Sequence, residues 1–285
     1  MGLSTNVDRV VKISVMGEIA HPITSSPFRL DSEGRPHITP GTGGITYNFA
    51  LGDNAFDVEG DHIEPDVSTK NFDKEKGNAY MTYSCIGNEA FVISGDAKDE
   101  KGRVIGKHGG INHVLIYFPR DVKEKLAIGD KIQIKAWGQG LKLEDYPSIK
   151  VFNIDPEVFE KLSLTEKEGK IYFPVVAKIP GYLMGSGVGS RNPGGTDYDI
   201  ITHDKDLMKK LDLTKLKIGD FVAIENHNNS FGVGGYKENA ISIGVVVHSN
   251  CFSTGHGPGV VVVMTSSEPV IIPEIKEEVN LKNFF

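Results

Sequence analysis

The sequence contains little cysteine, only Cys85 and Cys251 among 285 residues. The two lie far apart and fit neither the spacing of a zinc ribbon nor that of a redox CxxC motif. We therefore predict two free thiols, with a single disulfide between them as the alternative. An N-terminal basic segment followed by an apolar core and a cleavage site is also lacking, and no apolar run approaches the ~18 residues of a membrane span. These absences predict a cytoplasmic protein without a membrane partner.

Positive charge is in short supply as well. The formal net charge is −7 at pH 7, and the isoelectric point is about 5.7. Proteins that bind the nucleic-acid backbone usually present a basic face, so we expect no nucleic-acid partner. In the glycine-rich stretch Gly185–Gly195, Asn192 stands where the third glycine of a GxGxxG motif would be, and no phosphate-binding loop, GxSxG or HExxH motif is present. We therefore expect no nucleotide cofactor.

Glycine, by contrast, is abundant. The chain has 33 glycines, above the ~7% of an average protein, and many lie beside Asp, Asn or His. They are dense from Pro40 to Pro65 (PGTGGITYNFALGDNAFDVEGDHIEP). Glycine permits backbone angles that other residues avoid, and functional loops are commonly carried by rigid scaffolds. This stretch therefore predicts a loop-built site on a β scaffold.

Two short valine-rich runs, Ile241–Val247 and Val260–Met264, predict buried strands, because β-branched runs of this length favour strands over helices. Their near-continuous apolarity indicates that both faces are covered. Further strand-like segments are Val10–Val15, Tyr80–Ile93, His113–Phe118 and Lys131–Ala136. Helical patterns occur at Asp155–Leu162 and Asp204–Leu213. The sequence thus predicts a mainly β fold, a β-rich α+β protein with a few short helices.

The chain also resembles itself at a nearly constant offset. GGITYNF (Gly43–Phe49) is similar to GGTDYDI (Gly194–Ile200), 151 positions later. GKHGG around His108 is similar to GHGPG around His256, 148 positions later. We therefore predict sheets packed from two similar β-rich halves, 1–150 and 151–285, whose paired loops meet near a pseudo-two-fold axis. The alternative is that glycine-rich turns look alike in any β protein.

The second half carries the main candidate site. Asp197 and Asp199 flank Tyr198, and at strand spacing both carboxylates point to the same face. Carboxylates that share a face repel, and a divalent metal commonly resolves that repulsion. His248 and His256, at the ends of the polar connection between the valine-rich runs, offer nitrogens that suit Zn, Mn or Fe. We predict these two aspartates and two histidines as metal ligands; the alternatives are carboxylates that accept backbone hydrogen bonds and histidines bonded to backbone carbonyls.

Other residues complete the predicted site. His108 and Asp61 are candidate catalytic groups, either as a general base or as first-half counterparts of the second-half ligands. Because adjacent strand residues point to opposite faces, at most one of Asp61 and His62 serves a given site. Histidines without supporting context are expected on the surface: His21, His37, His203 and His227. Glycines whose amides are predicted to bind a ligand are Gly194, Gly195, Gly255, Gly257 and Gly259.

Across almost its whole length the chain resembles a family of bacterial and archaeal proteins known only as a domain of unknown function. The segments that carry this resemblance are PGTGGITYN, GDHIEP, GKHGGINHV, TDYDI and VVVHSNCFSTGHGPGV. The motif order of residues 192–260 is also similar to that of the metal-dependent acetamidase/formamidase family, in which an apolar strand leads into a His-bearing Gly-Asp-Gly-Glu loop. Here Gly-His-Gly-Pro-Gly replaces that acidic loop, and the aspartate at the end of the strand is absent. The second resemblance implies a metal-dependent hydrolase scaffold whose binding loop differs from that of the family.

These patterns predict a metal-dependent hydrolase of a small polar, amide-like substrate, in which the metal activates water and glycine amides hold the developing oxyanion. The competing prediction is a non-catalytic protein that binds a small molecule or anion in its glycine-rich loops. Exposed strand edges and an apolar C-terminal tail also predict a homo-oligomer.

Overall fold

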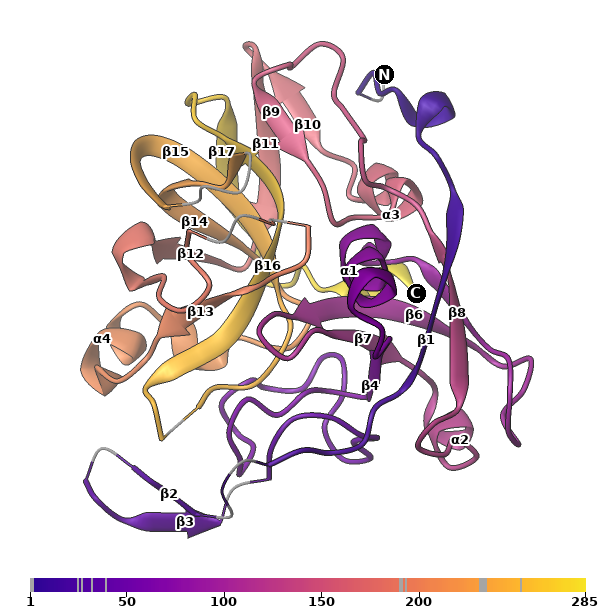
Figure 1. Cartoon of the computed structure of the whole chain (residues 1–285). Coiled ribbons are helices and arrows are strands. Elements are labelled where there is room, and N and C mark those ends of the chain that lie inside the picture. The colour runs from indigo at the N-terminus through magenta and orange to yellow at the C-terminus, as the bar shows by residue number, and fades with distance from the viewer. Residues whose placement is uncertain are drawn as a thin grey trace.

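Six antiparallel strands close into a barrel in the order β1-β4-β7-β6-β5-β8. They are β1 (Ile13–Ile19), β4 (Val67–Lys70), β5 (Glu89–Val92), β6 (Lys101–His108), β7 (His113–Tyr117) and β8 (Lys131–Ala136). The computed structural model describes residues 3–285 except positions 25, 27, 32, 39, 190, 191, 193, 231–234 and 252. Figure 1 shows the barrel to the right of the second sheet.

The second sheet has the order β12-β14-β15-β16-β13, with β9 paired to β16. Its strands are β9 (Ile149–Val151), β12 (Ala177–Pro180), β13 (Tyr198–Ile201), β14 (Phe221–Asn228), β15 (Gly235–Val246) and β16 (His256–Ser266). Two smaller sheets join β10 (Thr165–Lys167), β11 (Lys170–Val175) and β17 (Ile271–Ile275), and β2 (Phe28–Leu30) with β3 (Pro36–Ile38). The predicted mainly β fold of two β-rich halves is confirmed, and the first half closes into a barrel whereas the sheet of the second stays open.

The valine-rich runs form β15 and β16 as predicted. Strand β15 begins before its run and ends at Val246, and β16 extends beyond its run at both ends. Val246 pairs with Val260 in an antiparallel register, and the side chains of both are fully buried. The connection between the two strands holds residues 247–255. The thiols of Cys85 and Cys251 are free and buried, which confirms the prediction that no disulfide joins them.

The α-helices of the described chain are α1 (Lys74–Tyr83), α2 (Arg120–Lys123), α3 (Pro156–Lys161) and α4 (Lys205–Lys210). The helices predicted near Asp155 and Asp204 are confirmed, and both aspartate side chains accept hydrogen bonds at the N-terminus of their helix. None of the helices that the structure describes is long and apolar enough to cross a membrane.

Helix α1 corrects the strand predicted for Tyr80–Ile93, because its last turn includes Tyr80 and the following strand, β5, begins only at Glu89. The side chain of Asp73 accepts hydrogen bonds from the backbone N–H groups of Glu75 and Lys76 and so starts the helix. Tyr80 and Met81, near the end of the helix, pack on the barrel core. A capping aspartate outside the strand-like run therefore decided the local structure.

Strands β6 and β7 form a wall shared by the barrel and the second sheet, and we refer to them as the shared wall. Val104 and Val114 point into the barrel core. Ile105 and Leu115, their neighbours in sequence, point to the opposite face and join the larger core beneath the second sheet. Both faces of the wall are therefore buried, and its hairpin end brings His108 next to the second sheet.

One surface prediction is wrong. His227 lies in β14 with 1% of its surface exposed, where its Nδ1 is 2.9 Å from the hydroxyl of Ser242 on the neighbouring strand. Burial lowers the pKa of His227 to about 4. The first four residues of β14, Phe221–Ile224, are fully buried, and the burial of this strand in the sheet overrides the polar sequence context from which surface exposure was predicted.

Candidate metal centre

Six side chains from separate segments converge at the hairpin end of the shared wall. They form two groups, each with its nitrogen and oxygen atoms within 4.8 Å of one another. The inner group consists of His108, Asp197 and His248. The outer group consists of His62, Asp199 and His256. The structure thus brings together the four predicted ligands and adds one histidine to each pair, His108 from β6 and His62 from the loop before β4.

The inner group is the more deeply buried of the two. Nε2 of His248 lies 2.9 Å from Oδ2 of Asp197 and 3.2 Å from Oδ1 of Asp199. The ring of His108 stacks on that of His248. Asp197 also accepts a hydrogen bond from the backbone N–H of Gly109 at 2.7 Å, so the hairpin turn of the shared wall fixes the carboxylate.

The outer group faces solvent on one side. Nδ1 of His256 lies 2.8 Å from Oδ2 of Asp199. Nε2 of His62 lies 3.3 Å from the same His256 nitrogen and 3.7 Å from the same Asp199 oxygen. Asp199 therefore turns Oδ2 toward the outer group and Oδ1 toward the inner group.

A buried carboxylate supports the inner group from behind. Glu64 lies 2.7 Å from Nδ1 of His108 and 2.9 Å from Nδ1 of His113, and it accepts hydrogen bonds from the hydroxyl of Ser68 and the backbone N–H of Gly43. Because Glu64 engages Nδ1 of His108, the other ring nitrogen, Nε2, is the one that can take part in the inner group. Carboxylates that hold the far nitrogen of a histidine are a common outer shell of metal sites.

The local sequence explains why the ligands point inward. Asp197 and Asp199 share one face as predicted, while Tyr198 between them is buried on the opposite face and donates a hydrogen bond to Asn229. In the neighbouring strand β16, Gly259 pairs with Asp199. A Cβ at Gly259 would collide with Nε2 of His248 and Oδ2 of Asp197, so only glycine permits this close approach.

The cluster concentrates positive charge around two carboxylates. Burial disfavours the ionised form of Asp199, but the neighbouring imidazoles of His248, His256 and His62 outweigh it and hold the pKa of the carboxyl well below its usual range. Burial lowers the pKa of His248, but Asp197 and Asp199 outweigh this effect and raise that pKa well above 6.5. Burial also lowers the pKa of His62, and there Asp199 outweighs it and raises the pKa to about 9. A divalent cation would supply the same positive charge in place of protons.

The centre opens into two adjoining pockets that share His62 and His108. One has a volume of about 570 Å³ and is lined by ligands of both groups together with a glycine-rich wall that includes Gly110, Gly187 and Gly189. The other has a volume of about 430 Å³, and its lining includes Arg29, Asp61 and residues 23, 24, 41 and 42. A small substrate can therefore reach both histidines.

The remaining predicted residues lie around the centre rather than in it. Asp61 accepts a hydrogen bond from the hydroxyl of Ser253 and lies 3.7 Å from Arg29. The carbonyl of Gly194 accepts a hydrogen bond from Lys107, and Gly195 donates one to Asn192.

Among the predicted glycines of the second His-Gly loop, Gly259 packs against the inner group as described above. Gly255 and Gly257 have φ angles of 71° and 88°, a region that favours glycine. Gly255 lines a separate pocket beside Cys251, so its contribution is to shape the turn before His256.

Sequence reasoning considered His62 only as an alternative to Asp61 and passed over Glu64. Their segment has no regular strand, and an isolated bridge between Asp61 and Cys251 brings it against the β15–β16 connection. His62 itself has a φ of 50°, a turn in which alternation between neighbouring residues does not apply. The only sequence signal for these two residues was the density of Gly, Asp and His within Pro40–Pro65.

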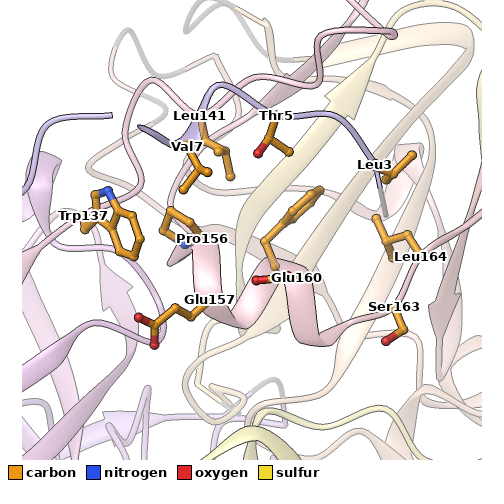
Figure 2. Close-up of a pocket in the computed structure, with 11 residues that line it drawn as sticks. Leu3, Thr5, Val7, Trp137, Leu141, Pro156, Glu157, Glu160, Ser163 and Leu164 are labelled. Atoms are coloured by element: carbon orange, nitrogen blue, oxygen red, sulfur yellow. The ribbon is translucent and has the colours of Figure 1, made fainter. Parts of the chain in front are cut away.

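A further pocket of about 210 Å³ lies by the N-terminal segment and α3 (Figure 2). Its wall is largely apolar, with Leu3, Val7, Trp137 and Leu141 around Pro156 (Figure 2). It shares no lining residue with the two groups and contains no histidine or cysteine among the described residues. It therefore lacks the side-chain chemistry of the two groups.

Comparison with known proteins places the chain within one family. The family model "Domain of unknown function (DUF4438), N-terminal" matches residues 28–160, and the corresponding C-terminal model matches residues 161–285. A solved structure, "Crystal structure of TM1086", is 54% identical, covers 100% of both chains and has a TM-score of 0.96. No curated protein matches the chain. The similarity to acetamidases and formamidases implied by the motif order is not among these findings.

Proposed function

Because this chain belongs to the DUF4438 family of unknown function, we propose its function from the site itself: a metal-dependent hydrolase of a small polar, amide-like substrate. The observation that carries the proposal is the convergence of His108, Asp197 and His248 beside an open pocket of about 570 Å³. Two imidazoles and a carboxylate form a donor set that suits Zn, Mn or Fe.

The surroundings of the donors support metal binding. Nδ1 of His248 lies 2.8 Å from the backbone carbonyl of Ser249, and Nδ1 of His108 is engaged by Glu64. An ion would displace the proton that Asp197 and Asp199 favour on His248. Each ring would then keep its proton on Nδ1 and turn the lone pair of Nε2 toward the ion. Asp197 is fixed by the N–H of Gly109, which reduces the entropy lost when an ion binds.

The reaction follows from this arrangement. A divalent ion held by these residues would lower the pKa of a bound water toward neutrality and so supply a nucleophile. Gly110, Gly187 and Gly189 leave room for a small planar amide beside the ligands, and backbone N–H groups of this wall would hold the charge that develops on the carbonyl oxygen. Asp61, at the rim of the adjoining pocket, is proposed as the proton acceptor, and the leaving amine takes up that proton as the C–N bond breaks.

Elemental analysis of protein purified without a His tag, before and after chelation, tests this proposal. We expect at least one tightly held transition metal per chain, and hydrolysis of small amides or esters that is lost on chelation and restored by Zn, Mn or Fe. His248→Ala should lose metal and activity, whereas His21→Ala, a change at an exposed histidine, should keep both. Metal-free wild type that is stabilised by small anions and hydrolyses nothing would support the non-catalytic binding protein instead.

We also propose that the protein is cytoplasmic and forms a homo-oligomer. The free thiols of Cys85 and Cys251 are compatible with a reducing compartment. For oligomerisation, the support is the β2–β3 hairpin, which projects from the molecule (Figure 1). Phe28 pairs with Ile38 on one face of this hairpin, and the two are 60% and 76% exposed. A lone two-stranded hairpin with an exposed apolar face is marginally stable in water, so a second copy of the chain is the proposed partner.

A further inference from the structure

We propose that the outer group, His62, Asp199 and His256, binds a second divalent ion, and that Asp199 bridges this ion to the one in the inner group. This inference deepens the proposed function, on which it rests for the first ion. It assigns a distinct role to the three residues that a single ion at the inner group leaves unused.

The outer group is a complete donor set in its own right. Nδ1 of His256 and Nε2 of His62 both face Oδ2 of Asp199, at 2.8 and 3.7 Å. The two nitrogens are themselves 3.3 Å apart, and all three atoms lie within the reach of one cation. The three residues come from a loop, from β13 and from the first residue of β16, so their convergence is a product of the tertiary fold.

The carboxylate of Asp199 lies between the two groups and contacts both. Its side chain is deeply buried, with the residue 7% exposed, yet Oδ1 accepts no hydrogen bond from any residue that the structure describes. Leaving a buried carboxylate oxygen unpaired is costly. Oδ1 faces the inner group, 3.2 Å from Nε2 of His248, so a cation held there would satisfy it while Oδ2 binds the outer cation.

The charges of the site also favour two ions. Glu64, Asp197 and Asp199 are buried carboxylates, with 1%, 6% and 7% of their surface exposed. They offset three of the four positive charges that two divalent ions bring, and a hydroxide nucleophile would offset the fourth.

The two groups resemble the carboxylate-bridged two-metal centres of hydrolytic enzymes. Two ions bridged by a carboxylate typically lie about 3.5–4 Å apart, which lets them stabilise the attacking and the leaving oxygen or nitrogen together. His62 and His256 both line the pocket of about 570 Å³. The outer ion would therefore lie where substrate enters, and would polarise the carbonyl of the amide.

The test is to load the metal-free full chain with Mn²⁺ and count bound ions by elemental analysis, together with electron paramagnetic resonance. We expect about two ions per chain and the signature of two coupled Mn²⁺ spins. His256→Ala and His62→Ala should each bind about one ion and lose the coupling. His21→Ala, at an exposed histidine outside both groups, should keep two coupled ions.

The outcomes separate this inference from the hydrolase proposal. One ion per chain at saturating Mn²⁺ overturns the second site, even if the protein hydrolyses amides. Two ions whose spins are uncoupled overturn the bridge. Two coupled ions without hydrolysis keep the centre and defeat the proposed reaction. Thermal unfolding of the metal-free variants shows whether each has folded, and if one has not, the wild-type stoichiometry and spin coupling decide.

Discussion

The imidazole rings of His108 and His248 stack with their centroids 4.2 Å apart and their planes tilted by 27°, although 140 positions separate them in the sequence. His108 ends a strand of the barrel, and His248 follows a strand of the second sheet. Two protonated rings this close would repel each other. The proposed metal would need both rings neutral, with Nε2 of each directed toward a common cation.

Glu64→Gln tests the support behind the inner group. A neutral amide cannot provide the negative charge that orients both His108 and His113, and losses of 10–100-fold in metal affinity are typical when such a partner is removed. We expect a loss of that size, measured by competition with a chelator of known affinity. Glu59→Gln, an exposed carboxylate five residues earlier in the same loop, serves as the matched control. Equal affinities for both variants and the wild type would show that Glu64 does not tune the ligand.

Gly259→Ala tests the close approach of β16 to the ligands. The added methyl would meet Nε2 of His248 and Oδ2 of Asp197, and overpacking of a buried site typically costs about 1–3 kcal/mol. We expect a lower unfolding midpoint in urea and a loss of bound metal. At Gly235 a Cβ meets nothing within 4 Å, so Gly235→Ala should preserve the metal content. A Gly259→Ala protein with full metal would mean that the ligands can shift aside.

His227 predicts a pH dependence that is independent of the metal. Burial lowers its pKa from 6.5 to about 4, so between these values the unfolded chain binds more protons than the folded one. The stabilisation is therefore fully present above about pH 6.5 and is lost as the pH falls toward 4. Urea unfolding at pH 7.5 and 4.5 should show that the wild type loses about 2.5 kcal/mol more than His227→Gln does. Parallel losses in the two proteins would assign the acid sensitivity to other groups.

Ile38→Asp tests the hairpin as the contact between copies. A charge in the middle of the apolar face should break a contact that buries Phe28 and Ile38, and light scattering should then report a smaller species than the wild type. Val11→Asp changes an equally exposed residue, 73% exposed, away from the hairpin and should leave the mass unchanged. If wild type and Ile38→Asp both have the mass of one chain, the oligomer proposal fails.

The parts of the site that follow a regular period could be predicted from the sequence. Alternation placed Asp197 and Asp199 on one face, and the valine-rich runs placed His248 and His256 at the two ends of one connection. The internal similarity between the His-Gly loops correctly indicated that His108 and His256 belong to one region. These inferences needed only local rules of strand geometry.

His62 and Glu64 could not be found in this way, because long-range contacts determine the path of their loop. The backbone N–H of His62 donates to the carbonyl of Asn250 at 3.2 Å, a contact between residues 188 positions apart. No period in the sequence encodes that pairing. The same limit explains His227, whose burial is a property of the sheet in which it lies and not of its polar neighbours in sequence.

The shared wall would give the proposed metal centre a thermodynamic linkage to the assembly of the whole chain. His62 and His108 belong to the barrel half, whereas Asp197 and His248 belong to the other half, so neither half on its own offers a complete set of donors. An ion that binds only the assembled form stabilises it by about 4 kcal/mol at a concentration a thousand times its dissociation constant. The concentration of free metal would thus set the stability of the contact between the barrel and the second sheet. Removal of the ion would weaken this contact before either part unfolds.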